Sequence, residues 1–234
     1  MFLMRKERNV NTPKHISNEA PPSLPQAKLE RDLSLERLIF FSDAVFAIAI
    51  TLLALDIRLA LLPPNATDAQ VLNQLFALSP KYYSFGLSFL AIGLYWLGHH
   101  RMFHSIARFD PLLLILNLWL LLCIAFLPFP SSVIGDSTGR TASVFYALTL
   151  AITGLVSGGM WLYASAGGRL LAYELDRPSF RLSLVRSFLA PIFFLLSAAI
   201  ALWNPSLARI LWYLIALIGL IMALLSSRWF AKAG

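Results

Sequence analysis

The 234-residue sequence is 58% hydrophobic and only 13% charged, with a formal net charge of +7 and a mean hydropathy of +0.70. Soluble domains are about half apolar and about a quarter charged, so this composition excludes an ordinary soluble protein and predicts that most of the chain lies in a lipid bilayer. The basic residues fall between apolar segments and at the ends, unlike those of a nucleic-acid-binding surface. We therefore expect no nucleic-acid partner and no obvious soluble partner.

The first 36 residues differ from the rest of the sequence. They mix six Lys and Arg residues with four prolines and have no apolar stretch behind the basic start, which argues against a signal peptide. We expect a disordered basic cytoplasmic tail over residues 1–36. The alternative is a lipid-surface anchor, which the prolines disfavour.

Six apolar segments follow the tail. A helix needs about 20 apolar residues to cross the hydrocarbon core of a bilayer. The sequence therefore predicts an all-α integral membrane protein with six transmembrane helices, over residues 38–59, 82–103, 112–130, 142–164, 188–203 and 207–227. The fifth segment is short and carries Pro191 near its expected start, where a proline costs least.

The distribution of basic residues predicts the orientation. Lys and Arg are retained on the cytoplasmic side during insertion, and 15 of the 19 such residues fall on the side of the N-terminus if six segments cross the membrane. The expected outer loops hold the other four, which are Arg58, Lys81, Arg140 and Arg209. Both termini are therefore predicted to be cytoplasmic, with residues 229–234 forming a short C-terminal end.

Asp43 is a carboxylate inside the first apolar segment. Such a group is costly in a membrane, so it is either a structural lock bonded to neighbouring helices or an ion-binding or proton-relay group. At about 100° per residue, Ile48, Thr51, Leu52 and Leu55 share a stripe about 100° wide, and Asp43 lies about 140° from Ile48. If the stripe faces a pore, Asp43 faces helices of its own subunit, which favours the lock.

The second and third segments offer polar partners for Asp43. A hydrogen-bonded cluster at one depth would contain Ser42, Asp43, Trp96, His99 and Asn117. An alternative is a metal site at His100 and His104, which share a helix face, but no further ligand stands at a matching spacing.

The chain lacks nucleotide-binding loops, dinucleotide fingerprints and common hydrolase motifs. Its single cysteine, Cys123, lies in an apolar run and excludes an intramolecular disulfide. Gly154 and Gly158 in the fourth segment predict a close helix approach, which is most simply packing inside one subunit. We expect no enzyme, no cofactor and no tightly bound metal.

Several short motifs gather in residues 37–130. They are Arg37, the FSD of residues 41–43 followed by VFAIAITLLALDI, the HHRMF at the end of the second segment, and NLWLLLCIAFLPF in the third. Together they resemble the transmembrane protein 175 family of potassium channels in its short prokaryotic form. The resemblance implies a homotetramer in the bacterial plasma membrane, in which the first helices of four chains line a central pore and residues 37–228 form the channel domain.

The resemblance also implies roles for individual residues. Ile48 would be the narrowest hydrophobic constriction, with Thr51, Leu52 and Leu55 continuing the pore lining. Four Thr51 hydroxyls would offer oxygen ligands to a permeant potassium ion, although the hydroxyl could instead bond a carbonyl one turn earlier. The structural network implied for the first three helices contains Arg37, Phe41, Ser42, Asp43, Trp96, His99 and Asn117.

These observations predict a potassium-selective channel with passive permeation. One rival class is a proton-coupled secondary transporter that uses Asp43 and the histidines of the second helix, and it would predict broken helices and inverted repeats. A membrane enzyme with a His and Asp site is a third class, without an accompanying nucleophile. Asp56 either raises the local cation concentration or pairs with Arg58.

Overall fold

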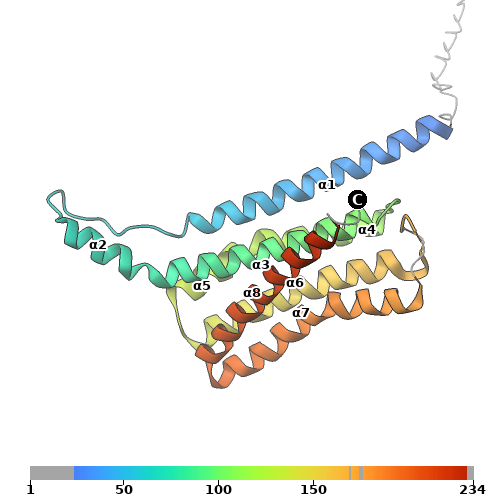
Figure 1. Ribbon diagram of the computed structural model, residues 1–234. Coiled ribbons are helices and arrows are strands. Elements are labelled where there is room, and N and C mark those ends of the chain that lie inside the picture. The colour runs from blue at the N-terminus through green and yellow to red at the C-terminus, as the bar shows by residue number, and fades with distance from the viewer. Residues whose placement is uncertain (1–23, 169, 174–175, 231–234) are drawn as a thin grey trace, which may run out of the picture.

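The computed structural model describes residues 24–168, 170–173 and 176–230, most of which are helical (Figure 1). The helices are α1 (Leu24–Ala54), α2 (Asp68–Ala77), α3 (Ser79–His104), α4 (Pro111–Phe126), α5 (Pro128–Asp136), α6 (Arg140–Ser165), the 3-10 turn η1 (Ala166–Gly168), α7 (Arg177–Trp203) and α8 (Pro205–Phe230). These ranges contain no β-strand, and Ile106 and Leu171 form an isolated antiparallel bridge. The fold is all-helical.

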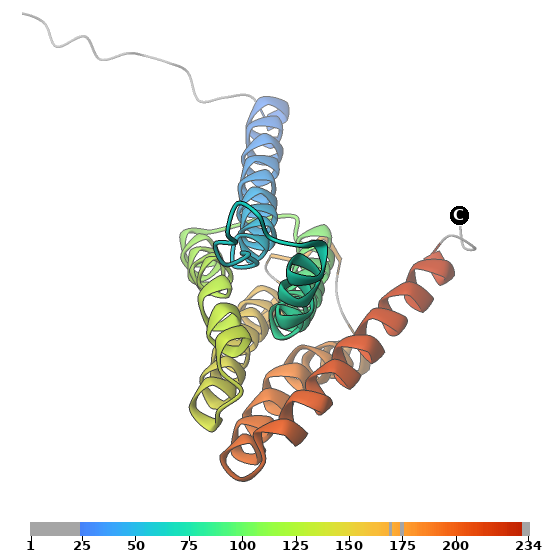
Figure 2. The same ribbon diagram turned by 90° about the vertical axis from the view of Figure 1, so that its left-hand side faces the viewer.

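The helices form a bundle with α1 on one side. Seen along the bundle in Figure 2, α1 lies at one apex, α3 and the pair α4–α5 flank it, and α7 and α8 lie farthest from it. Helix α1 contacts α3, α4 and α5, and α6 packs against both α4 and α7. One face of α1 is therefore left uncovered. We call the end of the bundle near Ser42 the inner end and the end near Asp56 the outer end.

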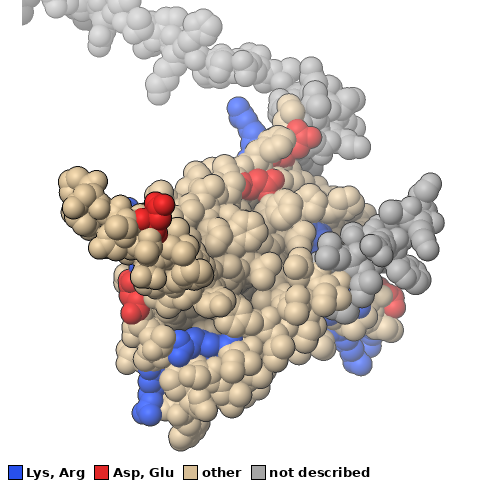
Figure 3. All heavy atoms as spheres, turned by 60° about the vertical axis from the view of Figure 1, so that its left-hand side comes forward, with Lys and Arg blue, Asp and Glu red and all other residues tan. Residues whose placement is uncertain are grey.

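Within the described ranges, four segments are long and apolar enough to cross a membrane by length and composition. They are Leu33–Ala54, Pro111–Asp136, Arg140–Gly168 and Arg177–Trp203. Helix α3 has 26 residues but carries serine, tyrosine and histidine side chains that reduce its mean hydropathy, and the apolar part of α8 that is described spans Pro205–Ile221. Figure 3 shows broad areas of surface without charged side chains, with Lys, Arg, Asp and Glu in separate groups around them.

Helix α1 starts earlier than the expected boundary. It begins at Leu24 instead of near residue 37, so the later part of the expected tail is helical, and residues 1–23 lie outside the described ranges. The last tail proline, Pro25, falls in the first helical turn, where its missing amide hydrogen is not needed. Residues 26–37 are mostly good helix formers such as Gln, Ala, Lys, Leu, Glu and Arg.

The third expected segment is split between two helices. Helix α4 ends at Phe126, and α5 begins at Pro128 and continues to Asp136, beyond the expected end at residue 130. Pro128 stands in the first turn of α5, where a proline is tolerated. Together the two helices form one apolar span.

The expected position of Pro191 is wrong. Helix α7 begins at Arg177, so Pro191 lies inside it and not near its start. Gly154 accommodates this proline, because a Cβ at Gly154 would lie 3.0 Å from the Pro191 ring, and a Cβ at Gly158 would lie 3.1 Å from the Phe188 ring. The glycine pair therefore packs α6 against α7 within one chain, which confirms the simpler interpretation.

Two loops are joined at the inner end. The amide of Ala107 donates to the Leu170 carbonyl at 2.8 Å, and the amide of Ala172 donates to the Ser105 carbonyl at 2.9 Å. These bonds tie the α3–α4 connection to the α6–α7 connection. The bundle is thereby closed at the end where the polar residues of the FSD motif lie.

Candidate functional site

One face of α1 is buried against the neighbouring helices. Ser42, Phe46, Ala49 and Leu53 recur at helical spacing, and each is at most 3% exposed. Their partners are α3, α4 and α5. Because lipid is as apolar as these side chains, van der Waals packing and hydrogen bonds stabilise such a contact more than the hydrophobic effect does. The hydrogen bonds of this face are therefore an important part of what holds α1 against α3, α4 and α5.

The FSD aspartate is bonded to α3. Trp96 donates its indole Nε1–H to Asp43 Oδ1 at 2.8 Å. The indole has one donor and the carboxylate accepts it. This bond joins α1 to α3 at the inner end.

A second chain of hydrogen bonds joins α1, α4 and α3, and its directions can be followed. Ser42 donates to the Leu38 carbonyl at 2.9 Å, so its oxygen accepts the Asn117 Nδ2–H at 2.9 Å. The Asn117 carbonyl oxygen then faces His99 Nε2 at 2.9 Å. His99 must donate through Nε2, which leaves Nδ1 as an acceptor that is buried without a partner in the described structure.

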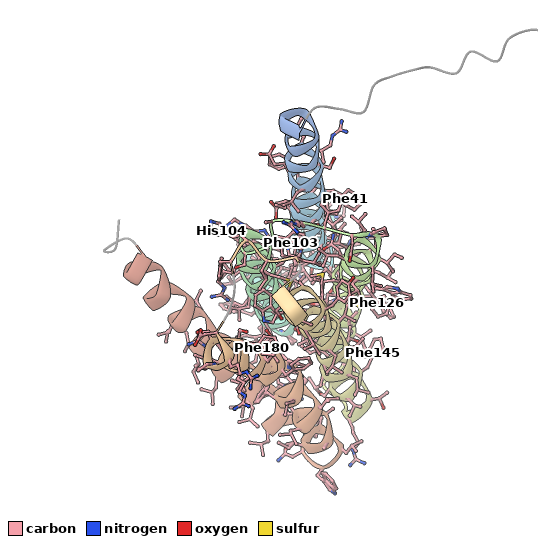
Figure 4. The ribbon with its side chains drawn as sticks, turned by 90° about the vertical axis from the view of Figure 1, so that its right-hand side faces the viewer. Phe41, Phe103, His104, Phe126, Phe145 and Phe180 are labelled. Carbon is pink, nitrogen blue, oxygen red and sulfur yellow. The ribbon has the colours of Figure 1, made fainter. Side chains whose placement is uncertain are left out.

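Aromatic rings enclose His99. The side chain is fully buried, and its ring centroid lies 5.4 Å from that of Phe46 and 4.4 Å from that of Phe103. Figure 4, seen from the inner end, shows Phe103 and His104 where α3 ends, below α1.

The structure brings together five of the seven residues expected in the polar network. Arg37 and Phe41 do not take part, because both are exposed and lie about 140° and 100° around α1 from Ser42. Both residues lie on the uncovered face of α1, toward its N-terminus from Ile48. Figure 4 labels Phe41 on this helix.

The two other α3 histidines, His100 and His104, lie outside any cluster of three possible metal ligands among the described residues, counting His, Cys, Asp and Glu side chains. Both histidines are exposed. The His100 ring lies 5.5 Å from the Trp96 ring. Packing accounts for this residue without a metal.

Opposite the buried face, α1 presents what we call the exposed stripe: Ile48, Thr51, Leu52 and Leu55. Ile48 is 57% exposed, Leu52 41% and Leu55 58%. The Thr51 hydroxyl donates to the Ile48 carbonyl at 2.8 Å. This is the bond to the preceding turn that the sequence left open, and it leaves the lone pairs of Thr51 Oγ1 directed outward as acceptors.

Sequence reasoning missed a charged cluster at the outer end. Asp56 accepts from Lys81 Nζ at 3.0 Å and from Ser132 Oγ at 2.7 Å, and Lys81 also pairs with Asp136 at 2.7 Å. Of the two alternatives that the sequence left open for Asp56, pairing with Arg58 does not occur, because the Arg58 guanidinium donates to the Leu55 carbonyl at 2.8 Å.

A buried hydroxyl cluster was also missed. Ser88 donates to Ser131 at 2.7 Å and contacts the Tyr146 hydroxyl at 2.9 Å. All three side chains are buried and belong to α3, α5 and α6. The spacing of Ser84 and Ser88 by one helical turn was the signal that could have revealed this polar face of α3.

Known proteins resemble this chain. The profile of the family described as the endosomal/lysosomal potassium channel TMEM175 matches residues 37–128. A protein of Streptomyces collinus named a potassium channel is 33% identical over 170 residues, which are 70% of this chain and 81% of that protein. Another of Chamaesiphon minutus, also named a potassium channel, is 37% identical over 148 residues, which are 60% of this chain and 71% of that protein.

A solved structure has the same fold. The crystal structure of a lysosomal potassium-selective channel TMEM175 homolog from Chamaesiphon minutus aligns with a TM-score of 0.71 and 27% identity, covering 81% of this chain and 98% of that chain. A human relative named an endosomal/lysosomal proton channel is 25% identical over 147 residues, which are 62% of this chain and 29% of that protein. The names of the relatives therefore differ in the ion.

Proposed function

The chain belongs to the TMEM175 family of ion channels, and we propose that it is a potassium-selective channel whose pore runs between the α1 helices of four copies. The family consists of ion channels, so the enzyme class considered from the sequence is excluded. The bacterial relatives named potassium channels support potassium as the permeant ion. Permeation is passive and requires no cofactor.

The proposed topology has six membrane-crossing helices per subunit. The crossings are α1, α3, α4 with α5, α6, α7 and α8, within a channel domain of residues 37–228. Both termini face the cytoplasm of a bacterial cell, and the plasma membrane surrounds the tetramer. The four apolar segments and the excess of basic residues at the inner side support this arrangement.

The observation that carries the proposal is the composition of the uncovered face of α1. The exposed positions between residues 44 and 55 are Ala44, Ala47, Ile48, Thr51, Leu52, Ala54 and Leu55. More than half of them are alanine or threonine, and small side chains let membrane helices approach closely. This favours a meeting of α1 helices around an axis.

The exposed face of α4 provides the contrast. It is built mainly from large apolar side chains: Leu112, Ile115, Leu118, Trp119, Leu122 and Phe126. Such a face suits lipid, since Ala125 is the one small side chain among its exposed residues and it carries no hydroxyl for an ion. We therefore place α4 toward lipid and α1 toward the axis.

The exposed stripe supplies the chemistry of permeation. A potassium ion prefers oxygen ligands, and four Thr51 hydroxyls around the axis offer acceptors, since each hydroxyl hydrogen is already donated to the Ile48 carbonyl. The Ile48 side chains form a hydrophobic constriction one turn away, and such a ring empties of water when it narrows. Thr51 would then select the ion and Ile48 would gate the pore.

In this proposal the hydrogen-bonded residues Ser42, Asp43, Trp96, His99 and Asn117, which we call the FSD network, hold the subunit together. Asp43 locks α1 to α3 through Trp96, and Ser42 locks α1 to α4 through Asn117. Neither group faces the exposed stripe. Their bonds keep the phase of α1 fixed, so that the stripe faces the axis.

Proton-coupled transport is the second candidate. One observation that favours it is the buried Nδ1 of His99, which has no hydrogen-bond partner in the described structure and lies near the Asp43 carboxylate. In addition, the human relative is named a proton channel. Such a protein would move potassium only with a proton gradient, or move protons alone. A central pore would then be unnecessary.

Flux through the full-length protein in liposomes tests the proposed function. Potassium-loaded vesicles diluted into sodium or N-methylglucamine medium should release potassium without any imposed proton gradient. Sodium-loaded vesicles should release sodium more slowly. Potassium release that requires a proton gradient would contradict the channel and support the transporter.

A further inference from the structure

Helix α1 and the turn after it are bonded to other helices at two places between Ser42 and Asp56. The inner place is the FSD network. The outer place is Asp56, which is bonded to Lys81 of α3 and Ser132 of α5. At 1.5 Å per residue, the two places lie about 20 Å apart, and the exposed stripe falls between them.

The outer place is a three-element charge cluster, which we call the outer clasp: Asp56, Lys81 and Asp136. Lys81 Nζ lies 3.0 Å from Asp56 Oδ2 and 2.7 Å from Asp136 Oδ1. The clasp joins the turn after α1, the first turn of α3 and the last residue of α5. The Lys81 and Asp56 side chains are 19% and 29% exposed, so water screens this pair less than a surface pair.

Gly135 permits the close approach of these elements. A Cβ at this position would lie 2.7 Å from Ser84 Oγ and 3.7 Å from Asp56 Oδ2. Even an alanine at this position would displace the Ser84 hydroxyl, which is bonded to the Lys81 carbonyl, and a larger side chain would crowd the contact between α5 and α3. The backbone of α5 is therefore shaped to reach the Asp56 turn.

Between the two anchored places, α1 is held to its own subunit by apolar side chains. Phe46, Ala49 and Leu53 supply this contact, and lipid offers such side chains nearly equivalent surroundings. Leu55 precedes Asp56 directly, and its amide is bonded to the Leu52 carbonyl at 3.1 Å. The positions of Leu52 and Leu55 therefore depend on how the Asp56 turn is held.

We propose that Asp56, Lys81 and Asp136 are positioning residues that hold the outer end of α1 against α3 and α5, and thereby keep Leu52 and Leu55 from closing the pore. The inference rests on the proposed function, because it takes the exposed stripe as the pore lining. When the clasp is broken, the outer end of α1 leans toward the axis. Its leucines then meet those of the other subunits, and the pore loses water and ions.

Potassium flux in liposomes gives the first readout. Lys81→Met should lower the flux about fivefold or more, a factor typical of the coupling between two sites. Arg140→Met is the matched control, because Arg140 is an exposed cation of the same end, and it should leave the flux unchanged. Lys81→Arg keeps a cation between Asp56 and Asp136 and leaves the net charge unchanged, so it should retain most of the flux.

Distances between subunits give a second readout that does not depend on conduction. Spin labels at Leu59 report the outer end and labels at Leu33 the inner end, in a Cys123→Ala background. Both positions are exposed. In Lys81→Met, the distances between Leu59 labels should shorten, while those between Leu33 labels should stay the same.

Two results would overturn the proposal: unchanged Leu59 distances in Lys81→Met, or a flux loss that is equal in Arg140→Met. If Lys81→Met does not assemble, Asp136→Asn carries the test, because Asp136 is 60% exposed and its loss should produce the same changes at smaller size. A wild-type protein without potassium flux would contradict the proposed function instead, and the label distances would still decide whether the clasp positions α1.

Discussion

The two long faces of α1 have different surroundings although both are mostly apolar. On one face, Ser42, Phe46 and Leu53 are at most 3% exposed and touch three other helices. On the other, Ile48 and Leu55 are more than half exposed. The two faces differ in their polar residues and not in their apolar character. Ser42 donates one hydrogen bond and accepts another within the subunit. Thr51 donates to the Ile48 carbonyl, and the acceptor side of its oxygen is directed away from the subunit. Substitutions on the two faces should therefore have different consequences.

The largest effect is expected on the buried side, at Asp43. Asp43→Ala leaves the Trp96 Nε1–H without its acceptor, and a buried unsatisfied donor costs about 1–3 kcal/mol. The variant should lose most of its tetramer in size-exclusion chromatography and unfold at lower temperature. Asp43→Asn keeps an oxygen acceptor and should assemble and conduct. A well-assembled but non-conducting Asp43→Asn would show that the carboxylate acts on the ion and not as a lock.

On the exposed side, Ile48→Asn should change conduction without changing assembly. An amide ring holds water where the isoleucine ring expels it, and we expect potassium flux to rise about tenfold, the factor for about 1.4 kcal/mol of barrier. Leu118→Asn in α4 is the matched control, because Leu118 is 54% exposed on the face that we place in lipid. An equal effect of the two substitutions would remove the distinction between α1 and α4.

A smaller effect is expected at Thr51, which sharpens the comparison within the exposed stripe. Thr51→Val keeps the shape but removes the oxygen, so the ratio of potassium to sodium flux should fall about fivefold, as for one lost interaction of about 1 kcal/mol. Thr51→Ser keeps the hydroxyl and should retain the ratio. Equal ratios in Val and Ser variants would mean that the hydroxyl only bonds the helix backbone.

The smallest effect is expected far from α1, where α6 meets α7. Gly154→Ala places a methyl group 3.0 Å from Pro191, and this crowding should lower stability by about 1 kcal/mol while flux per assembled tetramer stays constant. Gly86→Ala in α3 meets nothing within 4 Å and should not destabilise the protein. A change in ion selectivity in Gly154→Ala would place this contact nearer to the pore than we propose.

Helical periodicity was sufficient to separate the two faces of α1. Asp43 and Ile48 differ in phase by about 140°, and the structure has the same division between buried and exposed residues. Residue type was sufficient for Trp96, His99 and Asn117, since polar groups at one depth of a membrane protein must satisfy one another. Those assignments depended on spacing along single helices.

Pro191 and Asp56 could not be placed in the same way. The partner of Asp56 is Lys81, which is 25 residues away, and no local pattern favours it over Arg58. Sequence alone predicts a helix start near Pro191, because proline usually interrupts a helix. In the structure Pro191 lies inside α7, where Gly154 of α6 leaves room for its ring. Each of these features depends on a neighbour that is distant in sequence.

The most direct test of the central proposal is metal block at a single position of the exposed stripe. In a Cys123→Ala background, Ile48→Cys and the control Leu118→Cys are reconstituted separately, and potassium flux is measured with and without cadmium. Four thiolates around one axis should bind cadmium and stop the flux of Ile48→Cys, while Leu118→Cys stays open. Flux through Ile48→Cys that continues under saturating cadmium, as in Leu118→Cys, would contradict a pore lined by α1.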